Sequence, residues 1–118
     1  MSQTIEGADK IARVRELNDR LRATCVGGAI VCTQGVAAMP EETRRRVMAA
    51  VRSFEAFDAF DADNDPHGEH DFGSIEIDGE KLFFKIDYFD KAVETHSPDA
   101  ADPQVTTRIL TIMRADEY

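Results

Sequence analysis

Residues 72–89 read FGSIEIDGEKLFFKIDYF, and this stretch decides the fold. Two runs rich in β-branched and aromatic residues flank Asp78-Gly79, a dipeptide typical of the tight turn between antiparallel strands. Apolar side chains alternate along the second run, at Leu82, Phe84, Ile86 and Tyr88. An alternation with a period of two places these four side chains on one buried face of a strand. The stretch therefore predicts a β-hairpin with strands at residues 72–77 and 81–89.

Two segments ahead of the hairpin have the spacing of helices. Apolar residues recur at intervals of three and four between residues 8 and 23, at Ile11, Val14, Leu17 and Leu21. Gly27 and Gly28 then stop the pattern. A second helix is predicted from Pro40 to Phe57, because proline suits the first turn and two glutamates follow it at the positive end of the helix dipole. We expect its arginines at residues 44–46 to face solvent.

Two short strands complete the predicted fold. Residues 29–33 are apolar and β-branched, which favours a buried strand. Residues 106–113 fit a helix face or a strand, and their β-branched content favours the strand. Residues 95–103 contain two prolines and form a loop. The order α-β-α-β-β-β predicts an α+β fold, with two helices packed on a small, largely antiparallel sheet.

The length of 118 residues fits one domain, 1–118, with a flexible N-terminus at residues 1–7. The composition gives a net charge of −9, from 14 Lys and Arg against 23 Asp and Glu. This charge argues against direct binding of nucleic acid or of an anionic membrane, and it suits solubility, a basic protein partner or mimicry of nucleic acid. No apolar run approaches the roughly 18 residues of a membrane span, and the polar first ten residues do not resemble a signal peptide. We therefore expect a cytoplasmic protein.

The charge is divided unevenly along the chain. Residues 1–54 hold nine basic and six acidic side chains, a balance of +3, and residues 55–118 hold five and seventeen, a balance of −12. Such an asymmetry predicts surfaces of opposite sign on the folded protein. The two cysteines, Cys25 and Cys32, have apolar neighbours, and we expect them to be small buried thiols rather than a redox pair.

The segment 58–71 concentrates acidic residues and two histidines just ahead of the hairpin. Asp61, Asp63 and Asp65 alternate as in the first half of an EF-hand loop. The pattern fails at positions six and twelve, where Pro66 and Phe72 replace the required glycine and glutamate. An EF-hand is therefore rejected, and a looser calcium or magnesium site stays open.

The same segment offers ligands for a transition metal at His67, Glu69, His70 and Asp71. Imidazole and carboxylate groups suit zinc, manganese or iron, so these residues predict a divalent metal site, the centre of a small metal-binding or metal-dependent hydrolase domain. The alternative is structural: the acidic and imidazole groups fix the loop to the sheet, or to arginines of the second helix, through hydrogen bonds. No catalytic nucleophile and no nucleotide-binding loop is recognised.

Several motifs resemble those of one small bacterial family, a domain of unknown function. They comprise LNDRLR at 17–22, VAAMP at 36–40, NDPHGEHDFG at 64–73, KIDYFD at 85–90, SPDAADP at 97–103, LTIM at 110–113 and DEY at 116–118. The resemblance implies an origin on plasmids and other mobile elements, often near antirestriction genes. It implies an accessory or anti-defence role and no defined activity.

The leading hypothesis is a non-enzymatic acidic interaction protein, an inhibitor of a host complex that targets nucleic acid. It would block a basic nucleic-acid-binding surface by electrostatic complementarity. The residues expected to bind the partner are Asp61, Asp63, Asp65, Glu69, Asp87 and Asp90. The metal-binding domain is the alternative, and a homodimer formed through Phe83 and Phe89 is a third hypothesis.

Overall fold

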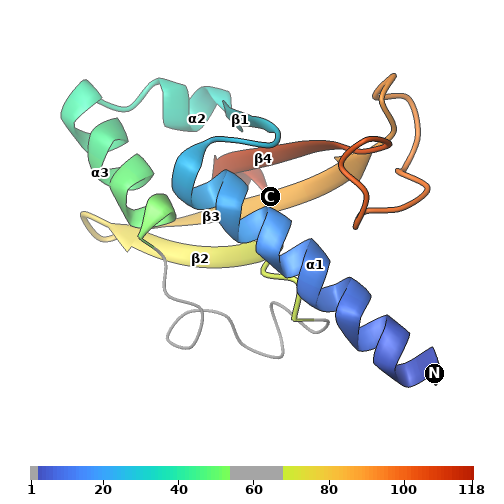
Figure 1. Cartoon of the computed structure of the whole chain (residues 1–118). Helices are drawn as coiled ribbons and strands as arrows, with labels where there is room; N and C mark the ends of the chain where they lie inside the picture. The colour runs from blue at the N-terminus through green and yellow to red at the C-terminus, as the bar shows by residue number, and fades with distance from the viewer. Residues whose placement is uncertain (1–2, 54–67) are drawn as a thin grey trace.

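The computed structural model describes residues 3–53 and 68–118, with side chains described from Asp9 onward. Within these described residues, three helices, four strands and a terminal 3-10 turn follow one another (Figure 1). Their bounds are α1 Gln3–Thr24, β1 Ala29–Cys32, α2 Gln34–Ala37, α3 Glu41–Arg52, β2 Phe72–Ile77, β3 Glu80–Phe89, β4 Thr107–Arg114 and η1 Ala115–Glu117. The α+β fold is confirmed, with the short helix α2 and the turn η1 added to the predicted order.

The four strands form one mixed sheet in the order β1-β4-β3-β2. β2 and β3 are antiparallel, as are β3 and β4, whereas the edge strand β1 runs parallel to β4. The β2–β3 turn contains Asp78 and Gly79 at φ values of 53° and 78°, and two positive φ values are what a type I′ turn requires. The predicted hairpin is confirmed, and its ladder begins at the pair Ile77 and Glu80.

The core lies between one face of the sheet and the helices α1 and α3, which cross that face (Figure 1). The predicted alternation is confirmed, because Leu82, Phe84, Ile86 and Tyr88 are all buried. The helices contribute Val14, Leu17, Leu21, Val47 and Val51. Burial of these side chains stabilises the fold by roughly 1.5–3 kcal/mol for each large apolar residue.

The bounds of α1 differ from the prediction at both ends. α1 begins at Gln3, so residues 3–7 of the predicted flexible terminus belong to its first turns. α1 ends at Thr24, and Cys25 follows in a left-handed conformation with φ of 63°. α3 is confirmed from Glu41 to Arg52, and the expected extension to Phe57 lies outside the described residues.

The strand predicted at residues 29–33 is confirmed, but its predicted burial was wrong. β1 spans Ala29–Cys32, and its residues are exposed apart from the half-buried Ile30. The apolar sequence led us to expect burial, but β1 is an edge strand with a described neighbour on one side only. The expectation of buried thiols was also wrong, because Cys32 lies on this edge and Cys25 lies beyond the end of α1, and both are exposed.

The arginines at residues 44–46 are exposed, as predicted. In the part of the chain that the structure describes, no helix has the length and apolar character to cross a membrane.

Candidate functional site

The structure brings the motif segments together where α1 crosses the sheet. Asn18 and Asp19 come from α1, Glu69 and His70 from the segment that leads into β2, and Tyr88 and Arg108 from neighbouring strands. We call these six residues the clamp cluster. The sheet register opposes Tyr88 and Arg108 directly, so both side chains rise from the same face toward α1.

Asn18 is the centre of the clamp cluster and has no exposed surface. Its Nδ2 donates to the Tyr88 hydroxyl at 2.7 Å and to the Glu69 carbonyl oxygen at 3.0 Å. Its Oδ1 accepts from Arg108 Nε at 2.9 Å. Both amide hydrogens and the amide oxygen are thereby used, which offsets the cost of burying the polar group.

The Tyr88 hydroxyl links Asn18 to the acidic segment, because it also donates to Glu69 Oε1 at 3.0 Å. Burial raises the pKa of Tyr88 well above its ordinary value; the hydrogen bond from Asn18 opposes this shift, and the carboxylates of Asp71 and Glu69 add to it. The hydroxyl is therefore a neutral donor at physiological pH.

Arg108 is a buried cation within the sheet, with 2% of its surface exposed. Besides Asn18, it donates to the carbonyl oxygen of Ala100, and its guanidinium lies 5.3 Å from the centre of the Tyr88 ring. Burial lowers the pKa of Arg108, and nearby Tyr88 and Glu69 oppose this shift. The contact with Ala100 ties the 97–103 motif to the other motif segments.

A second branch of contacts runs through His70. Its Nδ1 lies 2.9 Å from Asp19 Oδ1, which also accepts from Arg22 Nη2 at 3.2 Å. Arg22 in turn donates to the Val51 carbonyl oxygen at 3.0 Å and so joins α1 to α3. Gly68 and His70 have φ values of 69° and 58°, and these two left-handed residues turn the segment toward α1.

Chemically, this arrangement holds α1, residues 68–71 and the sheet together. The structural hypothesis for Glu69 and His70 is consistent with it, because both residues are hydrogen-bonded to described residues of α1 and β3. Asp71 uses its carbonyl oxygen to accept from Ile86 N at 2.8 Å.

The structure describes three of the four predicted metal ligands. His67 lies outside the described residues, and Glu69, His70 and Asp71 follow one another in the segment that leads into β2. Within residues 3–53 and 68–118, no group of three or more His, Cys, Asp or Glu side chains is arranged to hold a metal ion. The four-residue site stays a prediction.

The predicted partner-binding residues are divided in the same way. Asp61, Asp63 and Asp65 lie outside the described residues. Asp87 is half-exposed on β3, where its Oδ2 lies 3.0 Å from Lys85 Nζ. Asp90 accepts from the Glu94 N–H at 2.9 Å and from the Thr95 hydroxyl at 2.8 Å.

Asp87 lies near the end of β3 and Asp90 at the start of the long loop between β3 and β4, and this loop carries further acidic residues. We define the acidic end as Asp87, Asp90, Glu94, Asp99 and Asp102. Hydrogen bonds from the Glu94 backbone and the Thr95 side chain lower the pKa of Asp90, and the Ala101 backbone and Lys10 lower that of Asp99. Both carboxyl groups therefore stay ionised at neutral pH.

The two phenylalanines expected at a dimer contact lie on the face of the sheet opposite α1 and α3, and both are half-buried. Phe83 packs against Phe72 and Tyr118, with ring centres 5.2 and 5.5 Å away. Phe89 forms a backbone bridge with His96. The homodimer stays a prediction.

Sequence reasoning did not select Asn18, Asp19 or Arg108 as site residues. Asn18 and Asp19 stand in the LNDRLR motif, but nothing local says that they face the core. Arg108 did carry a signal, because it alternates with Leu110 and Ile112 and therefore shares their buried face.

Comparisons with curated proteins and with solved structures find no match. A family model matches residues 32–117, a range that includes Glu69, His70, Tyr88 and Arg108 and begins after Asn18. The chain therefore belongs to DUF3768, a family of proteins of unknown function.

Proposed function

We propose that this protein is a non-enzymatic binding protein whose acidic side docks on a basic protein surface, in competition with nucleic acid. The observation that carries the proposal is the segregation of charge. Residues 68–118 hold twelve acidic and five basic side chains, a balance of −7, whereas residues 9–53 hold five acidic and nine basic, a balance of +4. Such an acidic surface would attract a Lys/Arg-rich partner and speed the encounter.

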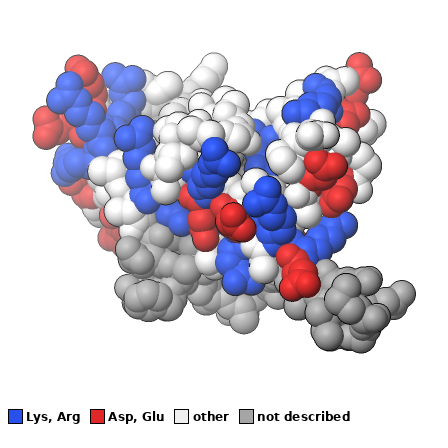
Figure 2. Space-filling view, viewed as in Figure 1, with Lys and Arg blue, Asp and Glu red and all other residues white. Residues whose placement is uncertain are grey.

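The arrangement of the elements supports a directional contact. The loop that carries the acidic end and the arginine-rich α3 lie at opposite ends of the molecule (Figure 1). On the face formed by the helices, basic side chains are interleaved with acidic ones (Figure 2). A basic partner would therefore meet less repulsion at the acidic end than at the helices.

The structural role of the clamp cluster also favours a binding function over a catalytic one. Asn18, Tyr88 and Arg108 are buried and hydrogen-bonded to one another or to the backbone, and these bonds hold helix to sheet. The residues left for recognition are then the exposed carboxylates. The finer proposal is that a mobile element encodes the protein to inhibit a nucleic-acid-targeting defence complex of its host, in the cytoplasm.

Transformation of bacteria tests this proposal. An unmodified plasmid is introduced into a restricting host and an isogenic non-restricting host, each with and without this protein. We expect the protein to raise the number of transformants in the restricting host alone, by about tenfold or more. No change in the restricting host would contradict the anti-defence role.

Charge-reversal variants identify the surface. Asp61→Lys, Asp63→Lys and Asp87→Lys together should abolish the effect, because they remove acidic side chains assigned to the partner contact. The matched control is Asp9→Lys, Glu16→Lys and Glu42→Lys. It changes the net charge by the same amount as the test variant, but at exposed positions on α1 and α3. If both triple variants lose the effect to the same extent, net charge rather than this surface is responsible, and the proposed site is wrong.

A further inference from the structure

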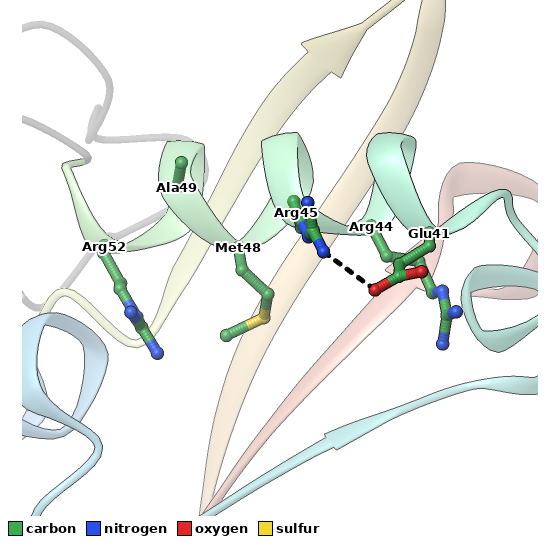
Figure 3. Close-up of a pocket in the computed structure, with 6 residues that line it drawn as sticks. All are labelled: Glu41, Arg44, Arg45, Met48, Ala49 and Arg52. Atoms are coloured by element: carbon green, nitrogen blue, oxygen red, sulfur yellow. Dashed lines mark hydrogen bonds and ion pairs between the residues drawn. The ribbon is translucent and has the colours of Figure 1, made fainter.

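A shallow groove on α3 concentrates positive charge in a protein of net charge −9. Its volume is about 460 Å³, and it is lined by Glu41, Arg44, Arg45, Met48, Ala49 and Arg52 (Figure 3). Arg45 pairs with Glu41 at 2.9 Å, and Glu41 is the one carboxylate among the described lining residues. Arg44 and Arg52 form no ion pair with any carboxylate of the described chain. Two cations are thus left to meet an acidic ligand.

The groove borders the edge strand β1 and the turn before it. Arg52 Nη2 lies 3.4 Å from Cys25 Sγ, and the charge of Arg44 acts on the Cys32 thiol. The side chains of Arg44, Met48 and Arg52 leave α3 on the side that faces the pale blue strand β1 (Figure 3). The arginines and the strand edge therefore belong to one surface.

β1 offers unpaired backbone groups beside these arginines. Thr33 N–H donates to Ile112 O on β4 at 3.0 Å. Because backbone groups alternate in direction along a strand, the N–H and C=O groups of Ile30 and Cys32 point away from β4, toward the free edge. In the described sheet, β1 has no second neighbour. An exposed edge of this kind is a template for an added strand.

The exposed apolar side chain of β1 lies on the other face of the strand. Val31 pairs with Thr111, on the face opposite the core, and is 43% exposed. Ile30 and Cys32 pair with the buried Leu110 and Ile112 and so share the face of the helices. A strand added here would therefore meet arginines on one face and a valine on the other.

We propose that the edge of β1 binds an extended acidic segment of a partner protein, whose carboxylates pair with Arg44 and Arg52. The spacing supports this occupant. The two arginines are eight residues apart on α3, about 12 Å along its axis. Side chains four residues apart on one face of an extended peptide are separated by about 13 Å. An acidic residue at each of these positions therefore matches both arginines while the backbone pairs with β1.

Two labelled heptapeptides of equal composition test the proposal by fluorescence anisotropy. In TEVTVET the glutamates are four residues apart on one face, and in TEVTEVT they are three apart on opposite faces. We expect TEVTVET to bind at least fivefold more tightly than TEVTEVT, because only in TEVTVET can both glutamates reach the two arginines at once. A third peptide, TEVTVET with its two valines and central threonine N-methylated, keeps the charge and loses backbone donors in either strand direction, and should also bind more weakly. Equal affinity for all three peptides would overturn the proposal.

Variants and hydrogen exchange locate the contact. Arg44→Gln with Arg52→Gln should weaken binding of TEVTVET about tenfold, as expected for two charge-assisted contacts. The matched control, Arg13→Gln with Arg20→Gln on α1, removes the same charge and should leave binding unchanged. When the peptide binds, the backbone amides of Ile30 and Cys32 should become protected from hydrogen exchange. The exchange rate of the Val31 amide should not change, because this amide already points toward β4. Protection that does not change at Ile30 and Cys32 would overturn strand addition.

An oligothymidylate of ten nucleotides separates a peptide site from a phosphate site. Tighter binding of this oligonucleotide than of TEVTVET, lost in the Arg44 and Arg52 double variant, would show that the groove is a nucleic-acid contact and would overturn the proposal. Failure of all three peptides to bind would overturn it as well. Cooperative unfolding curves that match the curve of the native protein confirm that both double variants are folded.

Discussion

Asn18 on α1 and Tyr88 on β3 are seventy residues apart in the chain and are joined by a 2.7 Å hydrogen bond in the core. The bond fixes the angle at which α1 crosses the sheet, because Asn18 also holds Arg108 on β4 and the backbone of Glu69. Three segments are thus oriented by one amide side chain. A buried polar network that is fully hydrogen-bonded favours a single packing arrangement, since any other arrangement leaves polar groups unpaired.

Asn18→Ala should lower the free energy of unfolding by about 2–4 kcal/mol, because it leaves the Arg108 Nε buried without its acceptor and removes the donor to the half-buried Glu69 carbonyl oxygen. Urea unfolding followed by circular dichroism measures the change. The control Gln104→Ala alters an exposed loop residue and should shift the value by less than about 0.5 kcal/mol. A change below about 1 kcal/mol for Asn18→Ala would mean that the network does not hold helix to sheet.

Tyr88 should make the stability of the protein fall more steeply in alkali than that of its Tyr88→Phe variant. The unfolded hydroxyl ionises near the ordinary pKa of 10.0, whereas burial keeps the folded hydroxyl protonated to higher pH. The contribution of Tyr88 is therefore complete below pH 10 and is lost as the pH rises above it. Relative to Tyr88→Phe, the free energy of unfolding should fall by up to about 1.4 kcal/mol per pH unit in this range. Urea unfolding at pH 8, 10 and 11 measures the difference, and parallel pH profiles would contradict the assignment.

The hairpin could be predicted from sequence because its determinants are local. Asp78-Gly79 specifies the turn, and the alternation up to Tyr88 specifies the buried face. The exposure of β1 could not be predicted from sequence, because an apolar run looks the same in a central strand and in an edge strand. The place of β1 in the sheet depends on β4, where Ile109 pairs with Ala29 from 80 residues further along the chain. The pairing of Asn18 with Tyr88 is likewise long-range.

The candidate site was predicted in part for the same reason. Glu69 and His70 stood out because they lie in a dense run of charge, which is visible in the sequence alone. Their partners Asn18 and Asp19 sit in an amphipathic helix whose polar residues all look alike until the helix is placed on the sheet. Arg108 differs from both groups, because a single arginine in a strongly alternating strand does indicate an inward-facing cation.

Both cysteines should react with the thiol reagent DTNB in the folded protein and release two equivalents of thionitrobenzoate. Cys25 and Cys32 are exposed, so no unfolding step is needed. Partial burial raises the pKa of Cys32 above its ordinary 9.0, although the nearby Arg44 opposes this shift. In a Cys25→Ser variant the rate at Cys32 should therefore keep rising beyond pH 9, because the thiolate is the reactive form. Release of two equivalents only after urea is added would show that the thiols are buried in solution.

Removal of divalent metal should leave the melting temperature unchanged. Glu69 Oε1 accepts from the Tyr88 hydroxyl and His70 Nδ1 lies against Asp19, so a metal at these atoms would have to replace contacts that already join α1 to the sheet. Elemental analysis of untagged protein, with melting curves in EDTA and in added zinc, manganese or calcium, measures both occupancy and stability. The Glu69→Gln variant keeps an oxygen acceptor for Tyr88 and is the matched control for the loss of a carboxylate ligand. Near one equivalent of metal, with a chelator-sensitive melting temperature in the native protein and not in Glu69→Gln, would contradict this expectation and would establish the metal site in the segment that contains His67, Glu69, His70 and Asp71.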